Sequence, residues 1–216
     1  MRKGFAISAA TAVALAVTAT SAAPAGAAGP RLVRGPDGVT VDIVALYGSG
    51  CPVGSTWASI LSDSKMLRVE YDRFAARSGG SSIPPDHRKT CKVVLKLNVP
   101  KEFTYAISSS YDSGYAAIED GAKATVKLGY SFQNVPPPDV THTVSGHFKD
   151  DWEFRNNPPA DSIIWKPCGE DQNLQITSEL TVDQGTSDPS KLNFIGMEPM
   201  ADSHHHFYNL AWKTCP

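Results

Sequence analysis

The sequence carries little charge and gathers neither sign into a cluster. Of its 216 residues, 20 are Lys or Arg and 22 are Asp or Glu, and charged residues make up only 19% of the chain. Such a balance excludes the basic surface on which nucleic-acid-binding proteins depend. The hydrophobic content of 41% is sufficient for a buried core, which excludes an intrinsically disordered chain.

The one long apolar run lies close to the N-terminus, between a basic start and a stretch of small residues. Arg2 and Lys3 precede the run Phe5–Val17, and Ser21–Ala28 follows it. The run has about 13 residues, against the ~20 needed to span a bilayer. This layout predicts a secretory signal peptide in residues 1–28, cleaved after Ala27 or Ala28.

Cleavage leaves residues 29–216 as the mature chain, and no break in composition divides this part. It has 188 residues, and its formal charge is −4 because the signal carries two basic and no acidic residues. No other apolar run is long enough to cross a membrane. We therefore expect a single domain that is soluble and extracellular, with no membrane span in the mature chain and no nucleic-acid partner.

The four cysteines are never closely spaced. Cys51, Cys91, Cys168 and Cys215 are at least 40 positions apart, which disfavours a zinc site built on C-x-x-C pairs. An oxidising compartment also disfavours a free catalytic thiol. Two disulfides are expected, and three connectivities are open to four cysteines. We favour Cys51–Cys91 and Cys168–Cys215, which close loops of similar length in each half of the chain.

The mature chain lacks any convincing helical periodicity over ten or more residues, whereas alternation of apolar and polar residues recurs throughout. It is strongest in Cys91–Val99 and Ala122–Phe132. Weaker alternation is present in Val39–Tyr47, Met66–Phe74, Phe103–Ile107, Val140–Phe148, Leu174–Val182 and Tyr208–Trp212. About nine or ten such strands, each with one wet face, predict an all-β fold. We expect an antiparallel two-sheet sandwich, jelly-roll-like and disulfide-linked.

Two stretches could hold a ligand through special local chemistry. Gly48–Ser55 is rich in glycine, but it lacks the Lys of a phosphate loop and the Gly-x-Ser-x-Gly order of a nucleophile elbow. A tight turn fastened by Cys51 is the better interpretation. In an extended chain, Asp202, His204 and His206 would share one face and could bind a metal. A solvated loop that binds metal only adventitiously is favoured over this trio.

Other polar residues give weaker signals. His142 shares the apolar face of its strand and His147 the opposite face, so we expect His142 to be a hydrogen-bonded core residue. Acidic pairs recur at Asp150-Asp151, Glu170-Asp171 and Asp183–Asp188, without the spacing of a calcium loop. Solvated turns are the default for these pairs. No residue is assigned as catalytic, cofactor-binding or metal-ligating, and no cofactor is expected.

The aromatic residues leave two interpretations open. On the surface of a sandwich they could stack on sugar rings, but most of them follow the buried parity of their strands, so core packing is favoured. The set consists of Trp57, Trp152, Trp165, Trp212, Tyr111 and Tyr115.

The order of several motifs resembles the secreted proteins grouped as domain of unknown function 4360. The resemblance spans roughly residues 39–215. The motifs are Gly48–Ser55, Val69–Phe74, Arg88–Cys91, Tyr115–Gly121 and Trp165–Gly169. It implies an exported single domain with paired cysteines, and it brings no activity from which a catalytic residue could be transferred.

Together these observations predict a non-enzymatic extracellular binding or surface-associated protein, with a glycan or a protein as its partner. The alternative is a secreted hydrolase that uses carboxylates or a metal. A flat face with exposed Trp or Tyr would favour binding, and a deep cleft with converging Asp, Glu or His would favour the hydrolase.

Overall fold

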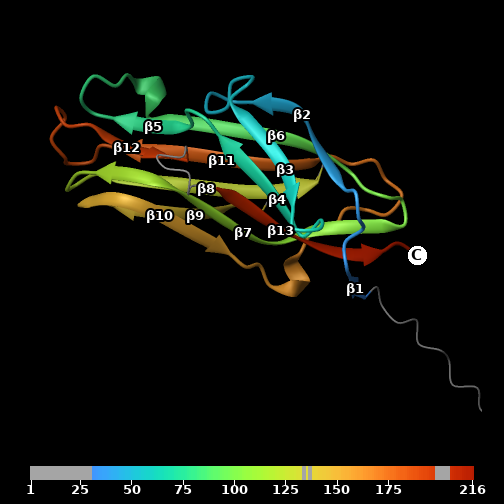
Figure 1. The fold of residues 1–216 in the computed structure, drawn as a ribbon. Helices are drawn as coiled ribbons and strands as arrows, with labels where there is room; N and C mark the ends of the chain where they lie inside the picture. The colour runs from blue at the N-terminus through green and yellow to red at the C-terminus, as the bar shows by residue number, and fades with distance from the viewer. Residues whose placement is uncertain (1–30, 133–134, 136–137, 198–204) are drawn as a thin grey trace, which may run out of the picture.

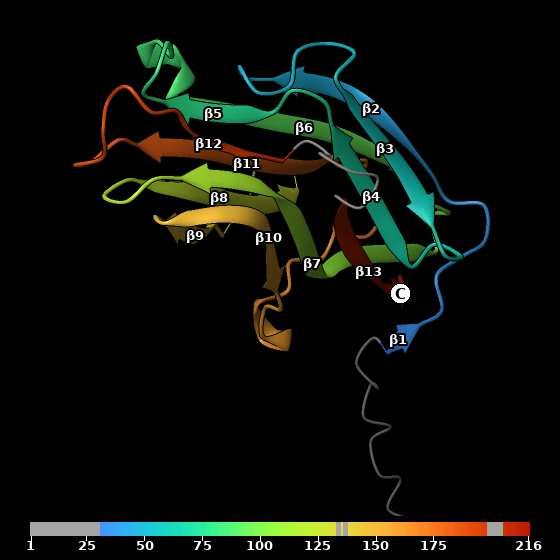
Figure 2. The same ribbon diagram turned by 60° about the vertical axis from the view of Figure 1, so that its left-hand side comes forward.

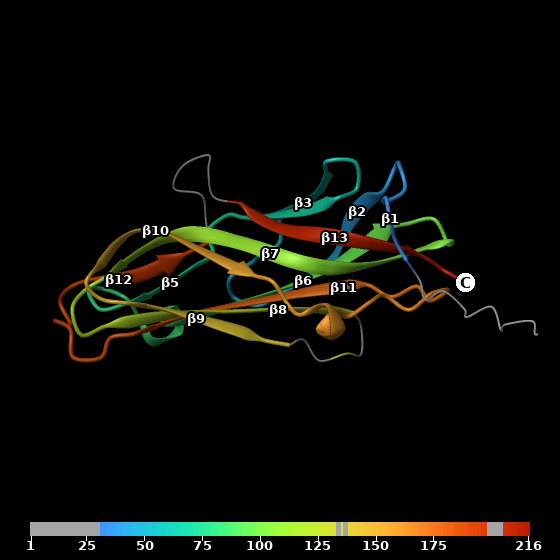
Figure 3. The same cartoon turned by 90° about the horizontal axis from the view of Figure 1, so that it is seen from below.

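The chain folds into two antiparallel sheets packed face to face, as a computed structural model shows (Figure 1). The structure describes residues 31–132, 135, 138–197 and 205–216, so the predicted signal peptide lies outside it. Figure 3 shows β7 and β13 in one layer and β8, β9 and β11 in the other. The predicted all-β sandwich is confirmed. Within the described residues, no helix is long and apolar enough to cross a membrane.

The larger sheet has eight strands. Its main order is β3-β4-β13-β7-β12-β5, with β1 paired to β13 and β10 paired to β7. The bounds are β1 Leu32–Val33, β3 Thr56–Leu61, β4 Met66–Tyr71, β5 Ala75–Ser78, β7 Phe103–Ile118, β10 Phe148–Asn156, β12 Asn193–Gly196 and β13 His206–Thr214.

The smaller sheet has five strands in the order β2-β6-β11-β8-β9. The bounds are β2 Thr40–Tyr47, β6 Arg88–Asn98, β8 Lys123–Phe132, β9 Val140–Ser145 and β11 Leu174–Asp183. Two short 3₁₀ turns, η1 Pro84–Asp86 and η2 Ala160–Ser162, lie in loops.

The core lies between the sheets and follows the alternation of the sequence. In β11 every second residue from Leu174 to Val182 is buried, and the residues between them are half-buried on the other face. Large side chains with almost no exposed surface fill the interior, among them Tyr71, Phe74, Tyr105 and Phe132. In strands such as β11, alternation therefore places one face in the core.

Both disulfides join the favoured pairs. Cys51–Cys91 connects the loop after β2 to β6, and Cys168–Cys215 fastens a long loop to the segment after β13. None of the described cysteines is free. Each bridge closes a loop of 40 or 47 residues, which limits the freedom of the unfolded chain.

The sequence prediction missed several strands and underestimated one. β1, β3, β5, β10 and β12 were not predicted, and Phe103–Ile107 is only the start of the 16-residue strand β7. The second half of β7 contains Asp112, Ser113 and Gly114, which are buried although they are not apolar. An added Cβ on Gly114 would overlap the Gly196 carbonyl oxygen and the Trp152 ring, so glycine is required at this crowded point.

Candidate binding surface

Aromatic side chains gather on the outer face of the eight-stranded sheet. In β13, His206 and Tyr208 point into the core, so their neighbours His205 and Phe207 point outward. The same alternation directs other rings outward from β3, β7 and β12. We call this set the aromatic face, and it consists of Trp57, Tyr111, Tyr115, Phe194, His205 and Phe207.

Register brings the rings of the aromatic face into contact across the strands. Phe207 lies directly opposite Tyr111, and their ring centroids are 6.2 Å apart in a stacked arrangement. His205 is 5.4 Å from Phe207, and Tyr115 is 5.6 Å from Phe194. Apart from Trp57, the rings therefore form two groups along β7, one at Tyr111 and one at Tyr115.

Charged groups of both signs flank these rings. Arg68 lies directly across from Phe207, and the Glu70 carboxylate is 3.6 Å from His205 Nδ1. The Arg155 guanidinium lies 4.7 Å from the centre of the Tyr111 ring, a cation–π contact. The aromatic face thus offers hydrogen-bond donors and acceptors beside apolar rings.

Tyr111 is the best-anchored ring of the aromatic face. Its hydroxyl donates a hydrogen bond to Glu153 at 2.5 Å. Partial burial, followed by this bond and the charge of Glu153, raises the pKa of Tyr111. The phenol therefore stays neutral and keeps its proton toward Glu153, which fixes the orientation of the ring.

Trp57 is the most exposed ring of the aromatic face. It lies on the edge strand β3, opposite Glu70 of β4, and 52% of its surface is exposed. Its neighbours on the strand, Thr56 and Ala58, face the core side. An exposed indole at a sheet edge can meet a ligand without displacing other side chains.

A buried polar cluster lies on the core side of the same strands. Asp112 and His206 are almost completely buried, and His206 Nδ1 is 3.1 Å from Asp112 Oδ1. His206 Nε2 lies 3.1 Å from the Met197 carbonyl oxygen, so Nε2 must carry a proton. A second proton lies between Nδ1 and the carboxylate, which makes His206 and Asp112 a hydrogen-bonded pair.

Two tyrosines complete this cluster. The Tyr208 hydroxyl donates a hydrogen bond to Asp112 Oδ1 at 3.4 Å, and the Tyr71 ring contacts the His206 ring edge-on at 5.1 Å. Burial raises the pKa of both tyrosines well above the ordinary value, and the charge of Asp112 raises it further. Because the cluster joins β4, β7 and β13, it fixes the register of the strands that carry the aromatic face.

A cavity of about 290 Å³ opens between the two sheets, close to η2. Its polar lining is largely satisfied, because Asn156 bonds both Ser110 Oγ and His142 Nε2. No Asp or Glu is among the described residues of its lining. The apolar and aromatic part of the lining consists of Leu128, Tyr130, Pro138, Val140, Pro158, Ile163, Ile164 and Tyr208.

The structure separates the aromatic residues that the sequence treated together. Trp152 and Trp212 are in the core, as predicted, with 3% exposure each. The core prediction is wrong for Trp57. Tyr111 and Tyr115 are half-buried on the outer face, because the strand parity assigned from sequence did not extend into the second half of β7.

Trp165 takes an intermediate position. Its segment forms a single bridge to Ala106 of β7, and its ring lies 3.8 Å below the Lys213 ammonium. The ring is half-buried and has a cationic partner.

The suggested metal trio does not form a described site. Asp202 and His204 lie outside the described residues, and His206 faces the core, paired with Asp112. No group of three or more metal-ligating side chains is present among residues 31–132, 138–197 and 205–216. His142 is hydrogen-bonded to Asn156 as expected, although it is half-buried rather than in the core, and His147 is exposed.

The remaining candidates serve local structure. Gly48 has a φ of +112°, and a Cβ there would overlap the Thr90 carbonyl, so the glycine-rich stretch is a turn beside the Cys51–Cys91 bridge. Asp183 accepts a hydrogen bond from the Gly185 amide, and Asp188 accepts one from the Ser190 amide. Among the other acidic residues, Asp171 pairs with Lys96, while Asp150, Asp151 and Glu170 are exposed.

Sequence reasoning did not identify Phe194, His205, Phe207 or Asp112. A usable signal existed for Phe207, which alternates with His206 and Tyr208 in a strand that was predicted from Tyr208 onward. For Asp112 no such signal existed, because a buried carboxylate is recognised by its partner, and His206 is 94 positions away.

Comparison with known proteins gives a family and distant relatives. The profile of the family described as "Domain of unknown function (DUF4360)" matches residues 37–215. A protein of Arthroderma benhamiae named "Uncharacterized secreted protein" is 25% identical over 181 residues, which cover 83% of this chain and 73% of that protein.

Two solved structures show weaker likeness. A structure of TmCBM61 in complex with β-1,4-galactotriose is 11% identical, with a TM-score of 0.29, over 78% of this chain and 90% of that one. A structure of infectious bursal disease virus, Gx strain, is 12% identical, with a TM-score of 0.17, over 88% and 42%. At such scores, the assignment of the sandwich rests on the strands of this chain rather than on either likeness.

Proposed function

The chain belongs to the DUF4360 family, and on that premise we propose that it is an exported glycan-binding protein whose ligand site is the aromatic face. The observation that carries this proposal is the contact of outward rings on neighbouring strands, Phe207 with Tyr111 and with His205. These rings lie on the face of a sheet rather than in a cleft, which suits an extended polymer bound along the surface.

The chemistry of a sugar matches this surface in two ways. A pyranose has an apolar C–H face, which gains when an aromatic ring covers it, and Trp57 offers such a ring with half of its surface exposed. The hydroxyl edge of the sugar needs donors and acceptors. Arg68, Glu70 and Arg155 supply both beside the rings, and bonds to charged groups are the stronger ones.

Export is part of the proposal. Residues 1–28 have the layout of a cleaved signal peptide, and residues 29–216 are proposed as a single mature extracellular domain. Two disulfides support an oxidising destination, and the relative from Arthroderma benhamiae is named as secreted. Amino-terminal sequencing of the protein recovered from culture medium should find a start at Ala28 or Gly29. A start at Met1 would contradict this part.

Retention on insoluble polysaccharides tests the ligand class. Wild-type protein is passed over cellulose, chitin, β-1,3-glucan and purified cell walls, one matrix at a time. We expect retention on at least one matrix, and Trp57→Ala should weaken it about tenfold, equivalent to about 1.4 kcal/mol. Retention on none of them would overturn the proposal.

The matched control is Tyr47→Ala. Tyr47 ends β2 of the five-stranded sheet, and 59% of its surface is exposed, which is close to the exposure of Trp57. The proposal predicts full retention of this variant. Equal losses of retention in the two variants would indicate non-specific adsorption through exposed aromatic rings.

The hydrolase alternative is tested in the same samples, because it predicts new reducing ends on the retained polysaccharide and the binding proposal predicts none.

A further inference from the structure

β9 is the edge strand of the five-stranded sheet, and its outer edge has no strand partner among the described residues. Its inner edge pairs with β8 from Leu128 opposite Val140 to Lys123 opposite Ser145. Figures 1 and 2 place β9 at the margin of the sandwich beside β10. The unpaired amide and carbonyl groups of such an edge are a template for another strand.

Most other edges carry features that prevent pairing. β2 contains Asp42 and a register irregularity between Ile43 and Ala45. β5 is only four residues long and includes Arg77, and β10 contains five charged residues in nine. Charges, irregular register and short length are the usual protection of edge strands, and β9 has none of these.

The sequence of β9 is complementary to itself. Val140-Thr141-His142-Thr143-Val144 is uncharged, contains no proline and is the same in both directions. In an antiparallel pair centred on His142, Thr141 of one copy faces Thr143 of the other on the outer side of the sheet. Val140 faces Val144 on the inner side. Thr–Thr and β-branched pairs of this kind stabilise antiparallel strands.

The environment of the strand suits such a pair. Thr141 and Thr143 are exposed, and 40% of the surface of Val140 is exposed at the lining of the 290 Å³ cavity. His142 is held in place on the inner side, because its ring stacks on Phe154 at 4.1 Å and Nε2 is 3.0 Å from Asn156 Oδ1. Pairing would therefore meet an ordered strand and cover an exposed valine.

β3 is the other uncharged edge of comparable length, and it lacks this symmetry. A pair centred on Ala58 would set Trp57 against Ser59 and Thr56 against Ile60. Opposed polar and apolar residues give no such complementarity. We propose that β9 is a self-pairing edge through which two copies of this chain join their five-stranded sheets into one continuous antiparallel sheet with two-fold symmetry.

Light scattering coupled to size-exclusion chromatography tests this proposal on the disulfide-linked mature protein. We expect a concentration-dependent dimer. Thr141→Glu combined with Thr143→Glu should weaken association about tenfold or more, because like charges would face each other twice across the two-fold axis. Within one chain, Glu at position 141 would lie opposite Lys127, so the fold itself should tolerate the change.

Charge complementation separates a true β9 pair from a folding defect. Thr141→Lys combined with Thr143→Lys should also give a monomer, and mixing this variant with the Glu variant should restore a dimer. Thr40→Glu on the opposite edge strand β2, where Thr40 is also exposed, should dimerise as wild type does. A wild-type protein that is monomeric up to about 1 mM, or a dimer unaffected by the Glu pair, would overturn the proposal.

Discussion

The two sheets of the sandwich present different surfaces to solvent, although both follow the same alternation of residues. The outer face of the eight-stranded sheet carries aromatic rings flanked by charges. The five-stranded sheet carries threonines and mutually paired charges, as in Arg88–Glu179 at 2.6 Å and Lys127–Asp139 at 2.7 Å. Charges are paired on both faces, since Arg68 and Glu70 form an ion pair at 3.4 Å beside the rings. The clustered aromatic rings are therefore what distinguishes the outer face of the eight-stranded sheet, and they point to it as the binding side.

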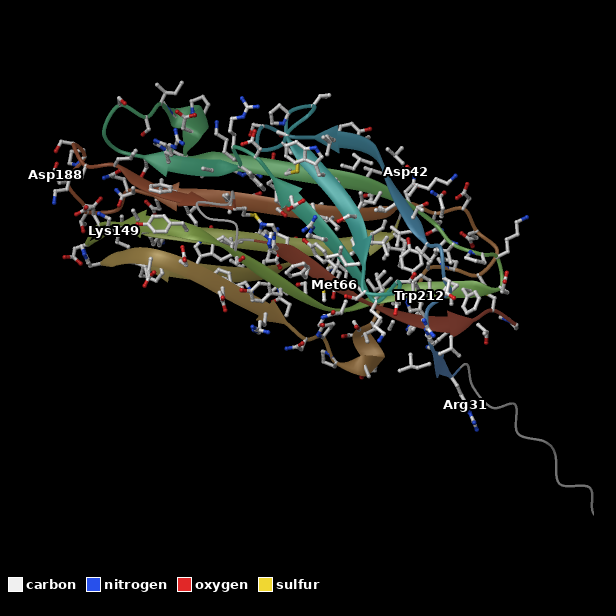
Figure 4. All side chains as sticks on the ribbon, viewed as in Figure 1. Arg31, Asp42, Met66, Lys149, Asp188 and Trp212 are labelled. Carbon is white, nitrogen blue, oxygen red and sulfur yellow. A yellow bond between two sulfur atoms is a disulfide. The ribbon has the colours of Figure 1, made fainter. Side chains whose placement is uncertain are left out.

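The core sides of the sheets differ in a corresponding way. Under the five-stranded sheet the buried residues are apolar, among them Val126, Ile176 and Leu180, with Ser178 as a polar exception. Under the aromatic face the core contains the hydrogen-bonded pair of Asp112 and His206. Figure 4 shows how densely side chains cover the sandwich between Lys149 and Asp188 at one end and Trp212 at the other. Hydrogen bonds depend on direction, so this buried pair holds β7 and β13 in register and thereby positions the rings on their outer face.

The largest expected effect comes from breaking this buried pair. Asp112→Asn removes the negative charge from the oxygen that His206 Nδ1 and the Tyr208 hydroxyl both contact. A carboxamide presents either an oxygen or an NH2 group at that position, so in either orientation at least one of these two buried groups loses the acceptor that it has in the wild type. We expect a loss of about 3–5 kcal/mol in the free energy of unfolding, measured by urea denaturation.

Glu70→Gln is the control for this change, because Glu70 contacts His205 on the outer face of the same strands. Glu70→Gln should lower the free energy of unfolding far less than Asp112→Asn does, because the Glu70 side chain is one-third exposed. Equal losses at Asp112 and Glu70 would show that the buried pair has no special role.

An intermediate effect per residue is expected at alkaline pH, and most of it should arise from the eight-stranded sheet. Burial raises the pKa of Tyr71, Tyr105 and Tyr208, all on strands of that sheet. Burial also raises the pKa of Tyr130 on β8 of the five-stranded sheet, but Tyr130 is only half-buried. Above pH 10 the unfolded chain releases these protons and the folded chain keeps them. Stability is therefore fully present below pH 10 and falls as the pH rises, by about 1.4 kcal/mol per pH unit for each tyrosine.

The measurement is a series of urea denaturation curves between pH 8 and 11. Tyr208→Phe removes one of the retained protons, so the decline above pH 10 should be shallower than in wild type, whatever the stability at pH 8. Parallel declines in the two proteins would contradict the assignment.

The smallest effect is expected on the five-stranded sheet. The hydrogen bond and charge of Arg88 lower the pKa of Glu179, so the stability from this pair is present above the ordinary Glu value and is lost as the pH falls through the lowered one. Exposed ion pairs contribute at most about 1 kcal/mol. Thermal unfolding at pH 7 should show Glu179→Gln as slightly destabilised, and the difference should disappear at pH 2. A difference that persists at pH 2 would refute the pairing as its cause.

The sequence was sufficient for the features that depend on regular alternation. β6, β8 and β11 were predicted because one face of each is apolar at nearly every position. The disulfide pairing favoured for its similar loop lengths, one of three open connectivities, is the one found in the structure. β7 was cut short because Ser, Asp and Gly residues replace apolar ones in its buried second half. Their burial depends on partners from β10, β12 and β13, which lie far away in the sequence.

The binding surface was harder to predict for a related reason. Alternation predicts which residues of a strand share a face, but it does not predict whether that face is buried in the core or exposed to solvent. Trp57 alternates with Ala58 and Ile60, and it would have been assigned to the outer face had β3 been identified as a strand. The contact of Phe207 with Tyr111 depends on the register of β13 against β7, which only the folded chain establishes.

The most direct test of the aromatic face is the response of the tryptophan indole N–H signals to ligand in nuclear magnetic resonance. The chain has four tryptophans, of which Trp152 and Trp212 are buried and Trp57 is exposed on the aromatic face. A soluble fragment of the polysaccharide that retains the protein is titrated into the labelled protein, with signals assigned by Trp→Phe variants. The account predicts that the Trp57 signal shifts in a saturable manner while those of Trp152 and Trp212 stay in place. Saturable binding that leaves the Trp57 signal unchanged would contradict it.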